Sequence, residues 1–432
     1  MPDANVGAMG IRARTGLHEW LAYIEGIHFT AMELGLDRVT AVRERLGLNP
    51  AFPILTVGGT NGKGSVCAYL EAMLSAAGYR VGLYSSPHLL RFNERIRVAR
   101  KEASDVALVD AFARIEEVRP PQSLTYFEFG TLAALDIFTR GKVDVAVLEV
   151  GLGGRLDAVN VFDADCAVVT VIDLDHTEYL GPDRESIGRE KSGIFRSQMP
   201  AVCGDPDPPA SLLASARTTG APLTLINRDY GYSADGGQWQ YWSARGKRSG
   251  LPHPALRGNC QLANAATAIA ALEQVSTKLP VEMGAVRRGL LETDLYGRFQ
   301  VLPGRPMVIL DVGHNPHAAR VVAENLRALP SAGRTRAVFA MLRDKDIQAV
   351  AAELRAGIDQ WYVAGLVGPR GVDAAQVSRA VQAAGAGGPI LQFETPALAY
   401  RAALDAAGQD DKILVFGSFH TVAEVMRARS GN

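Results

Sequence analysis

One ten-residue segment, Thr56-Val57-Gly58-Gly59-Thr60-Asn61-Gly62-Lys63-Gly64-Ser65, constrains the fold of this chain most strongly. An apolar run (54–57) leads into it, and a helical pattern (66–74) follows it. A buried strand, a glycine-rich turn and a helix start form a cradle for phosphate, because backbone N–H groups point at the anion and a lysine neutralises it. The segment departs from the usual P-loop pattern, since Val57 replaces the first glycine and Gly64 separates Lys63 from Ser65. The alternative is a tight connection that merely contains a lysine.

The composition excludes several classes of protein. A length of 432 residues suggests two to three domains. The balance of 45 Lys+Arg against 46 Asp+Glu argues against a dedicated nucleic-acid binder. Four distant cysteines form no CxxC pair, so we expect small buried hydrophobes rather than a zinc site or disulfides. Residues 1–15 lack the apolar core of a secretory signal, and no run of about 18 apolar residues occurs, so we expect a cytoplasmic protein without a membrane span.

Strand-like and helical patterns alternate along most of the chain. Apolar runs occur at residues 143–150, 166–172, 307–310, 336–339, 360–364 and 412–416, with helical patterns at 261–273 and 283–291. This alternation predicts an α/β fold with mainly parallel sheets. The polar and aromatic segment 227–250 predicts a β-hairpin insertion around Asp235-Gly236-Gly237. We place a domain boundary near Tyr296, which gives domains at 1–296 and 297–432.

Two polar residues follow predicted strands close to the phosphate cradle. Glu149 ends an apolar strand and precedes glycines. Ligands of open α/β sheets bind beyond the carboxyl ends of strands, and a carboxylate near phosphates suits Mg²⁺. The alternative for Glu149 is a solvated strand-end acid. His176, in Asp173-Leu174-Asp175-His176, ends the next strand. Alone it would be interpreted as a structural histidine, but its position parallel to Glu149 favours a metal ligand.

Three further sites carry polar groups. Lys191 lies on a predicted short helix, and by itself it would be interpreted as a surface lysine because lysine is seldom buried. Ser86 follows a strand and offers a hydroxyl. The segment Asp311-Val312-Gly313-His314-Asn315-Pro316 places a polar cluster after the first strand of the second domain. Asn315 before Pro316 is also typical of a helix N-cap, and both interpretations can hold together.

These motifs together resemble one family. Gly59-Thr60-Asn61-Gly62-Lys63-Gly64-Ser65, Ser85-Ser86-Pro87-His88-Leu89, Glu149-Val150-Gly151-Leu152-Gly153-Gly154-Arg155-Leu156-Asp157-Ala158, Asp175-His176 and the Asp311–Pro316 cluster look like folylpolyglutamate synthases, which are Mur-ligase-like ATP-dependent amide ligases. The likeness runs from Trp20 to Val425. Two more segments, around Thr125 and Ser418, are most similar to the bacterial bifunctional form, which is also a dihydrofolate synthase. Tyr296-Gly297-Arg298-Phe299 departs from the family's usual Pro-Gly-Arg-Phe, and Gly313 from a commoner alanine-bearing form.

The resemblance implies a role for each matching residue. Residues at the ATP would be Thr60, Asn61, Gly62, Lys63, Gly64, Asn264, Arg298 and Asp311. Residues at Mg²⁺ would be Ser65, Ser86, Glu149 and His176, supported by a carbamylated Lys191. Residues lining the glutamate pocket of the Rossmann-like second domain would be His314 and Ser418. Residues bordering the pterin would be Glu25, Gly26, Ile27, Thr125, Tyr126, Phe127, Glu128, Leu156, Asp157 and Ala158. Lys63, Lys191 and His314 would be catalytic.

The side chains of one segment also favour a flat ligand on their own chemistry. Tyr126 and Phe127 can stack on a ring, while Thr125 and Glu128 can hydrogen-bond its edge. The alternative is that these aromatic residues belong to the core, and for Phe129 we favour the core.

The expected reaction is ATP-dependent ligation of L-glutamate. A carboxylate of dihydropteroate or tetrahydrofolate would become an acyl phosphate, which the glutamate amine attacks, while closure of the second domain excludes water. The resemblance implies a monomer acting on small molecules. Three rivals are a synthase with only one of the two activities, a cell-wall Mur ligase and a P-loop regulatory NTPase. The cell-wall ligase is disfavoured because too little chain precedes the cradle, and the NTPase leaves the cluster at Asp311 unexplained.

Overall fold

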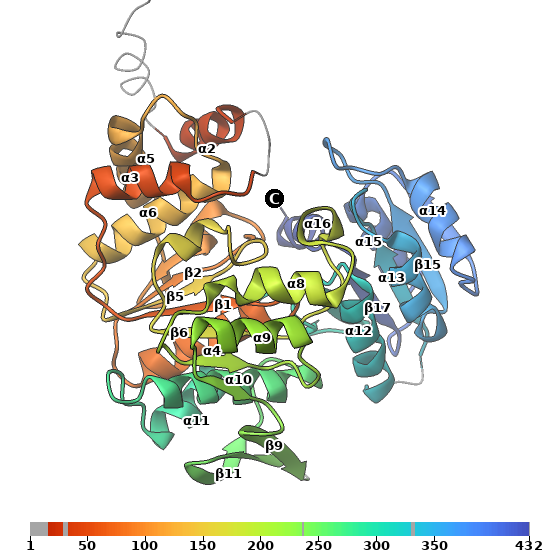
Figure 1. Ribbon diagram of the computed structural model, residues 1–432. Coiled ribbons are helices and arrows are strands. Elements are labelled where there is room, and N and C mark those ends of the chain that lie inside the picture. Colours follow the sequence, from red (N-terminus) through yellow and green to blue (C-terminus); the bar gives the residue numbers. More distant parts are fainter. Residues whose placement is uncertain (1–15, 29–32, 236, 330–332, 432) are drawn as a thin grey trace, which may run out of the picture. The chain divides into compact units, whose positions relative to one another are not determined.

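The computed structural model describes residues 16–28, 33–235, 237–329 and 333–431. It divides into two units (Figure 1). Unit 1 comprises Met1–His253 and Ala263–Thr293, and unit 2 comprises Pro254–Leu262 and Asp294–Asn432. The predicted boundary at 296/297 falls just beyond this division and stays a prediction about independent domains. The segment 1–15, in which no secretory signal was expected, lies outside the described residues.

Unit 1 is built on a sheet of eight strands in the order β4-β3-β2-β5-β1-β6-β7-β8. Their bounds are β1 Ile54–Gly58, β2 Val81–Tyr84, β3 Ile96–Val98, β4 Lys101–Glu102, β5 Val145–Glu149, β6 Cys166–Val169, β7 Ala201–Cys203 and β8 Leu223–Leu225. The six neighbouring strands β2, β5, β1, β6, β7 and β8 pair in parallel. Strands β3 and β4 extend the sheet beyond β2 as an antiparallel edge. Every residue of β1 and β5 is buried, as expected for central parallel strands covered on both faces.

Helices cover both faces of this sheet. Their bounds are α2 Leu17–Gly26, α3 Asp37–Leu46, α4 Lys63–Ala76, α5 Asp105–Val118, α6 Tyr126–Arg140, α7 Thr177–Leu180, α8 Arg184–Lys191, α9 Ala210–Thr219, α10 Cys260–Gln274 and α11 Met283–Glu292, with the 3₁₀ turns η1 Phe92–Arg95, η2 Ala158–Val161 and η3 Ser192–Ile194. On one face α4 packs against α11, and on the other α6 packs against α5 and α8 against α9. The crossover from β1 to β2 runs along the sheet in one direction, and those from β2 to β5, from β6 to β7 and from β7 to β8 run in the other. Because such crossovers are right-handed, their helices lie on opposite faces.

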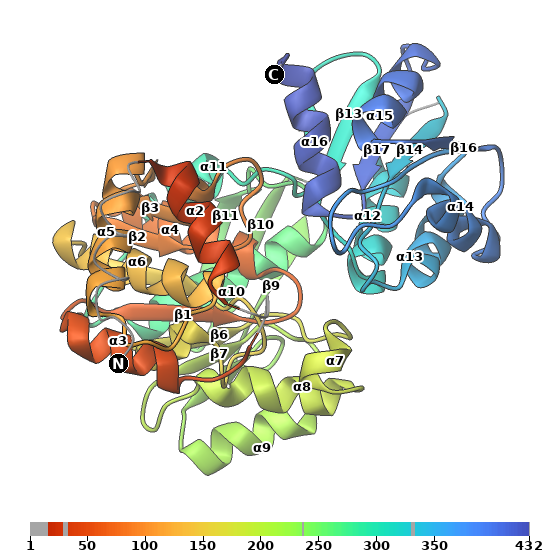
Figure 2. The same cartoon turned by 90° about the horizontal axis from the view of Figure 1, so that it is seen from above.

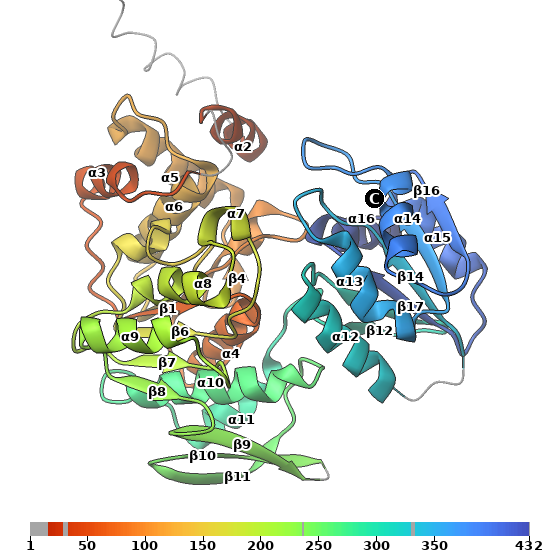
Figure 3. The ribbon, with the colours of Figure 1, turned by 45° about the vertical axis from the view of Figure 1, so that its right-hand side comes forward.

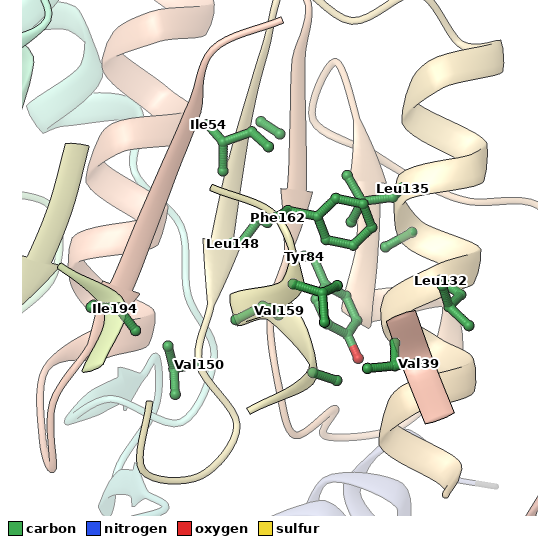
Figure 4. Packing of buried hydrophobic residues seen from close by; sticks show 14 of the residues in the cluster. Val39, Ile54, Tyr84, Leu132, Leu135, Leu148, Val150, Val159, Phe162 and Ile194 are labelled. Atoms are coloured by element: carbon green, nitrogen blue, oxygen red, sulfur yellow. The ribbon is translucent and has the colours of Figure 1, made fainter. Parts of the chain in front are cut away.

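The core beneath α6 fixes the strand ends that carry the predicted site. Figure 4 shows Leu135 of α6 close to Phe162, and Leu132 of α6 and Tyr84 at the end of β2 belong to the same cluster. All four side chains are almost completely buried. Burying side chains of this size contributes about 1.5–3 kcal/mol each relative to exposure. This packing fixes the positions of the carboxyl ends of β2 and β5, because Tyr84 of β2 and Leu148 of β5 belong to the same buried cluster.

The predicted hairpin insertion contains a third strand. Strands β9 Tyr230–Asp235, β10 Gln238–Ser243 and β11 Gly246–Pro252 form a separate antiparallel sheet in the order β11-β10-β9, visible beside α10 and α11 in Figure 3. Tyr241 of β10 donates a hydrogen bond to Glu273 of α10 at 2.8 Å, and Arg248 pairs with the same carboxylate at 2.6 Å. Strand β11 was not predicted, because its sequence is polar: a strand that is exposed on one face lacks the apolar run by which buried strands are recognised.

Unit 2 is a six-stranded sheet in the order β12-β13-β17-β14-β15-β16. Its elements are β12 Gln300–Leu302, β13 Met307–Asp311, α12 Pro316–Ala328, β14 Thr335–Phe339, α13 Ile347–Leu354, η4 Arg355–Gly357, β15 Gln360–Ala364, α14 Ala374–Ala383, β16 Ile390–Phe393, α15 Pro396–Asp405, β17 Lys412–Phe416 and α16 Phe419–Ser430. All strands but β12 are parallel. Helices α12, α13 and α14 neighbour one another, as do α15 and α16, on the two faces of the sheet (Figure 2). The α/β class and the Rossmann-like second sheet are confirmed.

The cysteine prediction holds for three residues of four. Cys67, Cys166 and Cys203 are buried and free, whereas Cys260 is only partly buried. No helix among the described residues combines the length and apolar character that crossing a membrane requires.

Candidate active site

The glycine-rich segment forms the predicted strand–turn–helix cradle between β1 and α4. Gly59 has a φ of 137°, and a Cβ there would lie 1.8 Å from the Thr170 hydroxyl. That hydroxyl lies 2.7 Å from the carbonyl of Asn61, and Thr60 N–H donates to the carbonyl of Val171 at 2.7 Å. Only glycine fits so close to the end of β6. The segment after β6 thus holds the cradle in shape.

The helix start in the cradle is open to an anion. Gly62, with a φ of 92°, is the N-cap of α4 and brings no side-chain cap. A Cβ at Gly62 would lie 2.7 Å from the amide oxygen of Asn264, so α10 places Asn264 directly against the turn. The first turn of α4 carries no acidic residue. The backbone N–H groups of this turn can therefore receive a phosphate.

Two lysine amines meet on one carbonyl of the cradle. Lys63 Nζ donates to the carbonyls of Gly59 and Thr60, each at 3.1 Å, and Lys191 Nζ donates to Gly59 at 2.9 Å. Lys191, at the end of α8, is only 4% exposed, which overturns the surface interpretation of this residue alone. Burial, reinforced by the charge of Lys63, lowers the pKa of Lys191 to about 7. The lysine amine is thus substantially neutral near physiological pH.

The ends of β2 and β5 bring Ser86 and Glu149 together. Ser86 N–H donates to Glu149 Oε2 at 3.2 Å, and Glu149 is 4% exposed. The charge of Glu149 also contributes to raising the pKa of Cys67 on α4, mainly a burial effect, so the carboxylate faces the cradle helix. Ser65, in the first turn of α4, is 2% exposed. The burial of Glu149 contradicts the alternative of a solvated strand-end acid.

His176 lies on the segment beyond β6. It is the N-cap of α7 with a φ of 51°, and its N–H donates to Asp175 Oδ1 at 2.9 Å. The same carboxylate oxygen lies 3.9 Å from His176 Nε2. Within the described ranges no three His, Cys, Asp or Glu residues cluster as a metal cage. Mg²⁺ does not require one, because it commonly uses one or two carboxylates and keeps phosphate and water oxygens.

The segment predicted to read a flat ring begins helix α6. Thr125 is the N-cap of α6: its Oγ1 accepts from Glu128 N–H at 3.2 Å, and Glu128 Oε2 accepts from Thr125 N–H at 2.7 Å. Both are buried, and Glu128 also pairs with Arg38 of α3 at 3.2 Å. These side chains form a capping box. Their hydrogen-bonding groups are therefore largely engaged within the protein.

The two aromatic side chains that follow, Tyr126 and Phe127, pack against the edge of the buried core. Phe127 lies over Gly151, where a Cβ would come within 2.7 Å of its ring, and its centroid is 5.6 Å from that of Tyr84. Tyr126 and Phe127 are partly exposed, whereas Phe129 is fully buried, as favoured from the sequence. The first turn of α6 thus presents two rings beside the end of β5.

Asp157 organises the loop after β5. Its carboxylate accepts from Leu152 N–H at 2.8 Å and from Val159 N–H at 3.0 Å. Burial outweighs these hydrogen bonds and raises its pKa to about 6. Ala158 is buried beside it at the start of η2, while Leu156 is partly exposed.

The end of α2 approaches the same region. Glu25, in the last turn, is exposed, and its charge contributes to raising the pKa of Tyr126, a shift caused first by burial. Gly26 ends α2 and Ile27 is its C-cap. Helices α2 and α6 are in contact, and the role of this region as a substrate border stays a prediction.

In unit 2, Asp311 ties the arginine segment to the end of β13. Its carboxylate accepts from Phe299 N–H at 2.8 Å and from Gly313 N–H at 2.7 Å, and burial raises its pKa. Arg298 lies over the ring of Phe419, 5.2 Å from guanidinium carbon to centroid. Asp311 thereby fixes the backbone directly after Arg298, while Val312 N–H donates to the carbonyl of Gly297, directly before it, at 2.9 Å.

His314 and Ser418 follow neighbouring parallel strands. His314 Nδ1 lies 3.0 Å from the carbonyl of Val312, and its ring centroid is 6.4 Å from that of Phe419. Ser418 is the buried N-cap of α16, accepting from Thr421 N–H at 3.0 Å. Asn315 caps α12 with Pro316 following it, so the helix-cap interpretation is confirmed.

Sequence reasoning missed the groups that support the cradle. Thr170 was overlooked because a lone threonine after a strand carries no signal. Asp205, after β7, accepts from Ile172 N–H at 2.7 Å and pairs with Arg184 at 3.2 Å, and so steadies the segment that leads to His176. The position of Asp205 just beyond a strand was a usable signal, of the same kind as that of Glu149.

Comparison with known families agrees with this architecture. Residues 57–272 match the model of the Mur ligase middle domain, and residues 297–419 match that of the Mur ligase glutamate ligase domain. The fold and site therefore define a Mur-type ligase.

Similar proteins of known function and structure identify the family within the Mur-type ligases. Dihydrofolate synthase/folylpolyglutamate synthase of Escherichia coli is 49% identical over 96% of both chains, and that of Haemophilus influenzae is 41% identical over 96% of this chain and 98% of its own. The solved structure of E. coli FolC in complex with DHPP and ADP has a TM-score of 0.92 at 47% identity, covering 97% of this chain and 99% of its own. A bifunctional folylpolyglutamate synthase/dihydrofolate synthase with Mn, AMPPNP and L-glutamate bound has a TM-score of 0.90 at 48% identity and the same coverage. The chain belongs to the dihydrofolate synthase/folylpolyglutamate synthase family.

Proposed function

We propose that this protein is an ATP-dependent amide ligase that adds L-glutamate to dihydropteroate, giving dihydrofolate, and to tetrahydrofolates, extending their glutamate chain. The observation that carries the proposal is the cradle in which Lys63 and Lys191 share the carbonyl of Gly59 at the end of β1. It lies in a chain that is 49% identical to a dihydrofolate synthase/folylpolyglutamate synthase over 96% of its length.

The cradle activates a carboxylate. A carboxylate is a poor acyl donor because its leaving group is oxide. Its oxygen attacks the γ-phosphorus of ATP, the bond to the bridging oxygen breaks, and acyl phosphate and ADP result. Thr60, Asn61, Gly62 and Gly64 hold the phosphates through the turn and helix start, and Asn264 supports the turn. Lys63 leaves its loop carbonyls and neutralises charge on the transferring group.

The strand ends beside the cradle fit Mg²⁺. Ser86 and the buried carboxylate of Glu149 lie together, and Ser65 is in the adjacent helix turn. These hard oxygen donors suit this ion beside phosphate. His176 is proposed as a further ligand. Bound Mg²⁺ would neutralise phosphate charge, and these residues would orient it.

Lys191 is proposed to be carbamylated. A buried amine held neutral can attack carbon dioxide, forming a carbamate with loss of one proton. The pKa of Lys191, lowered to about 7 by burial and by Lys63, makes the neutral amine available. The product is an anion, which the charge of the neighbouring Lys63 would stabilise. Lys191 would thus support the metal site.

Unit 2 is proposed to bind L-glutamate. His314 and Ser418 follow the carboxyl ends of β13 and β17, where ligands of parallel sheets bind. Arg298 and Asp311 are proposed to reach the nucleotide. The glutamate amine attacks the acyl phosphate carbon, phosphate leaves, and one proton is released as the amide forms.

The pterin end is proposed to lie at the start of α6. Tyr126 and Phe127 offer their rings, Asp157 offers a carboxylate, and Glu25, Gly26, Ile27, Leu156 and Ala158 border the same region. Because Thr125 and Glu128 cap the helix, we now assign them to holding these rings, with their backbone still available to the ligand. We further propose a cytoplasmic monomer whose partners are these small molecules, with no nucleic-acid or membrane partner.

The test is ADP release by the purified protein with ATP, Mg²⁺, L-glutamate and one acceptor at a time. We expect turnover with dihydropteroate and with tetrahydrofolate, and a γ-linked product with the latter by mass spectrometry. Turnover with one acceptor alone would indicate a single-activity synthase. ADP release that ignores both acceptors would indicate a regulatory NTPase and refute the proposal.

A further inference from the structure

Arg95 ends the 3₁₀ turn η1 and lies close to two aromatic side chains at the proposed pterin border. Its guanidinium carbon lies 5.4 Å from the centroid of Phe92 and 5.3 Å from that of Tyr126. The two rings themselves meet edge to face, 5.6 Å apart. Cation–π attraction to these rings holds the guanidinium through its charge and uses none of its N–H donors.

The backbone and one nitrogen of Arg95 are fixed to the turn that carries Ser86. Arg95 Nε donates to His88 Nδ1 at 2.8 Å, and the carbonyl of Arg95 accepts from Ser85 N–H at 2.9 Å. The loop between β2 and η1 therefore places the arginine: its partner His88 is two residues after the proposed Mg²⁺ ligand Ser86, and its guanidinium lies beside Tyr126 at the start of α6.

The two terminal nitrogens of Arg95 have no partner. Over the described ranges of the chain, Nη1 and Nη2 donate no hydrogen bond and join no ion pair. Other arginines nearby are paired with acids: Arg91 with Glu102, Arg97 with Glu71 and Arg114 with Asp136. A partly buried fork of N–H donors without a partner is suited to a carboxylate, which it binds through two parallel hydrogen bonds.

The chemistry of the two acceptors decides which carboxylate this is. Dihydropteroate ends in a single carboxylate, which must lie at the phosphate cradle to react. Tetrahydrofolate ends in a glutamate whose γ-carboxylate reacts and whose α-carboxylate does not. Arg95 contacts the aromatic border and His88, and it contacts neither Lys63 nor Glu149. Its partner is therefore a carboxylate displaced from the reacting one along the same arm.

We propose that Arg95 binds the α-carboxylate of the terminal glutamate of folate acceptors, and so determines how well the enzyme accepts folates relative to dihydropteroate. The proposal rests on the function proposed above and adds a specificity-determining residue to it. Glu25 supplies the opposite charge in the same region, since its charge contributes to raising the pKa of Tyr126. An acid and a base near one ring suit an arm with an amino-bearing pterin at one end and carboxylates at the other.

The test compares Arg95→Met with Arg91→Met. Methionine keeps apolar contact with Phe92 and Tyr126, while Arg91 is an exposed surface residue whose removal causes the same change of charge. We expect Arg95→Met to raise KM for tetrahydrofolate about tenfold to hundredfold, the loss of a charged hydrogen-bonded pair, and to leave KM for dihydropteroate and ATP within about twofold. Arg95→Lys keeps the positive charge but loses the paired N–H donors of the guanidinium, so its KM for tetrahydrofolate should lie between those of the wild type and Arg95→Met. Arg91→Met should match the wild type for every substrate.

A modified acceptor makes the test independent of protein folding. In an acceptor with 4-aminobutyrate in place of the terminal glutamate, the reacting carboxylate remains and the α-carboxylate is absent. The wild type should bind it about tenfold to hundredfold more weakly than tetrahydrofolate, and Arg95→Met should bind both alike. Equal rises in KM for both natural acceptors, or wild-type KM values in Arg95→Met, would overturn the proposal. Absence of wild-type turnover with either acceptor would instead refute the ligase function.

Discussion

Replacing Lys191 by methionine should stabilise unit 1 while abolishing ligation. Lys191 is 4% exposed and its amine faces Lys63 across the carbonyl of Gly59. A lysine kept out of water is stable mainly as the neutral amine, and its pKa falls from 10.5 to about 7. Each pKa unit corresponds to about 1.36 kcal/mol, so burial of this amine costs about 5 kcal/mol below pH 7.

The direction in which the free energy of unfolding changes with pH, and the pH range of that change, follow from proton binding at Lys191. Between pH 7 and 10.5 the unfolded chain binds a proton at Lys191 that the folded chain does not, so the free energy of unfolding rises with pH across this range. Methionine removes that cost and also the hydrogen bond to Gly59, which contributes about 1 kcal/mol. The variant should therefore be more stable by about 4 kcal/mol at pH 6.5, and this gain should fall to zero at about pH 10.

Urea unfolding in buffers free of carbon dioxide measures the difference. A Trp361→Phe background removes the one tryptophan of unit 2, so that fluorescence reports Trp20, Trp239 and Trp242 of unit 1. Lys101→Met, on the exposed strand β4, provides a control that should show no pH-dependent gain. A gain for Lys191→Met that is flat with pH, or a loss of stability at pH 6.5, would refute the reasoning. Added bicarbonate should increase wild-type activity if the carbamate forms.

Four further variants test the proposed roles in turnover. Lys63→Ala should lower kcat at least about a hundredfold with an unchanged melting temperature, because transition-state charge loses its partner; near-normal ADP release would remove the cradle assignment. Glu149→Gln and His176→Ala should each raise the Mg²⁺ concentration for half-maximal rate, and unchanged titrations in both would make the pair structural. Phe127→Ala should raise KM for dihydropteroate by about tenfold or more while KM for ATP stays constant; parallel changes would place the ring in the core.

The sequence was most informative where local chemistry alone decides the structure. The apolar strands 360–364 and 412–416 coincide with β15 and β17, because buried parallel strands read as unbroken apolar runs. The turn at Gly62 followed from the strand and helix around it. The features that could not be predicted depend on segments that are distant in sequence. One is the contact of Thr170 with Gly59. The other is the burial of Lys191, since a lysine usually lies at the surface. Nothing local to β11 indicated that it would pair with β10.

The start of α6 shows how one pattern can carry two meanings. Thr125-Tyr126-Phe127-Glu128 has the spacing of a capping box, and its acid and hydroxyl are used in that way. Removing a helix cap costs about 1 kcal/mol, and Glu128 also holds Arg38 of α3. The cap fixes the first turn, and that turn places Tyr126 against Phe92 and Arg95 and places Phe127 over Gly151. In the proposed site, Thr125 and Glu128 would therefore act on a bound ring through the aromatic side chains between them, and Glu128→Gln should disturb acceptor binding only as far as it loosens this turn.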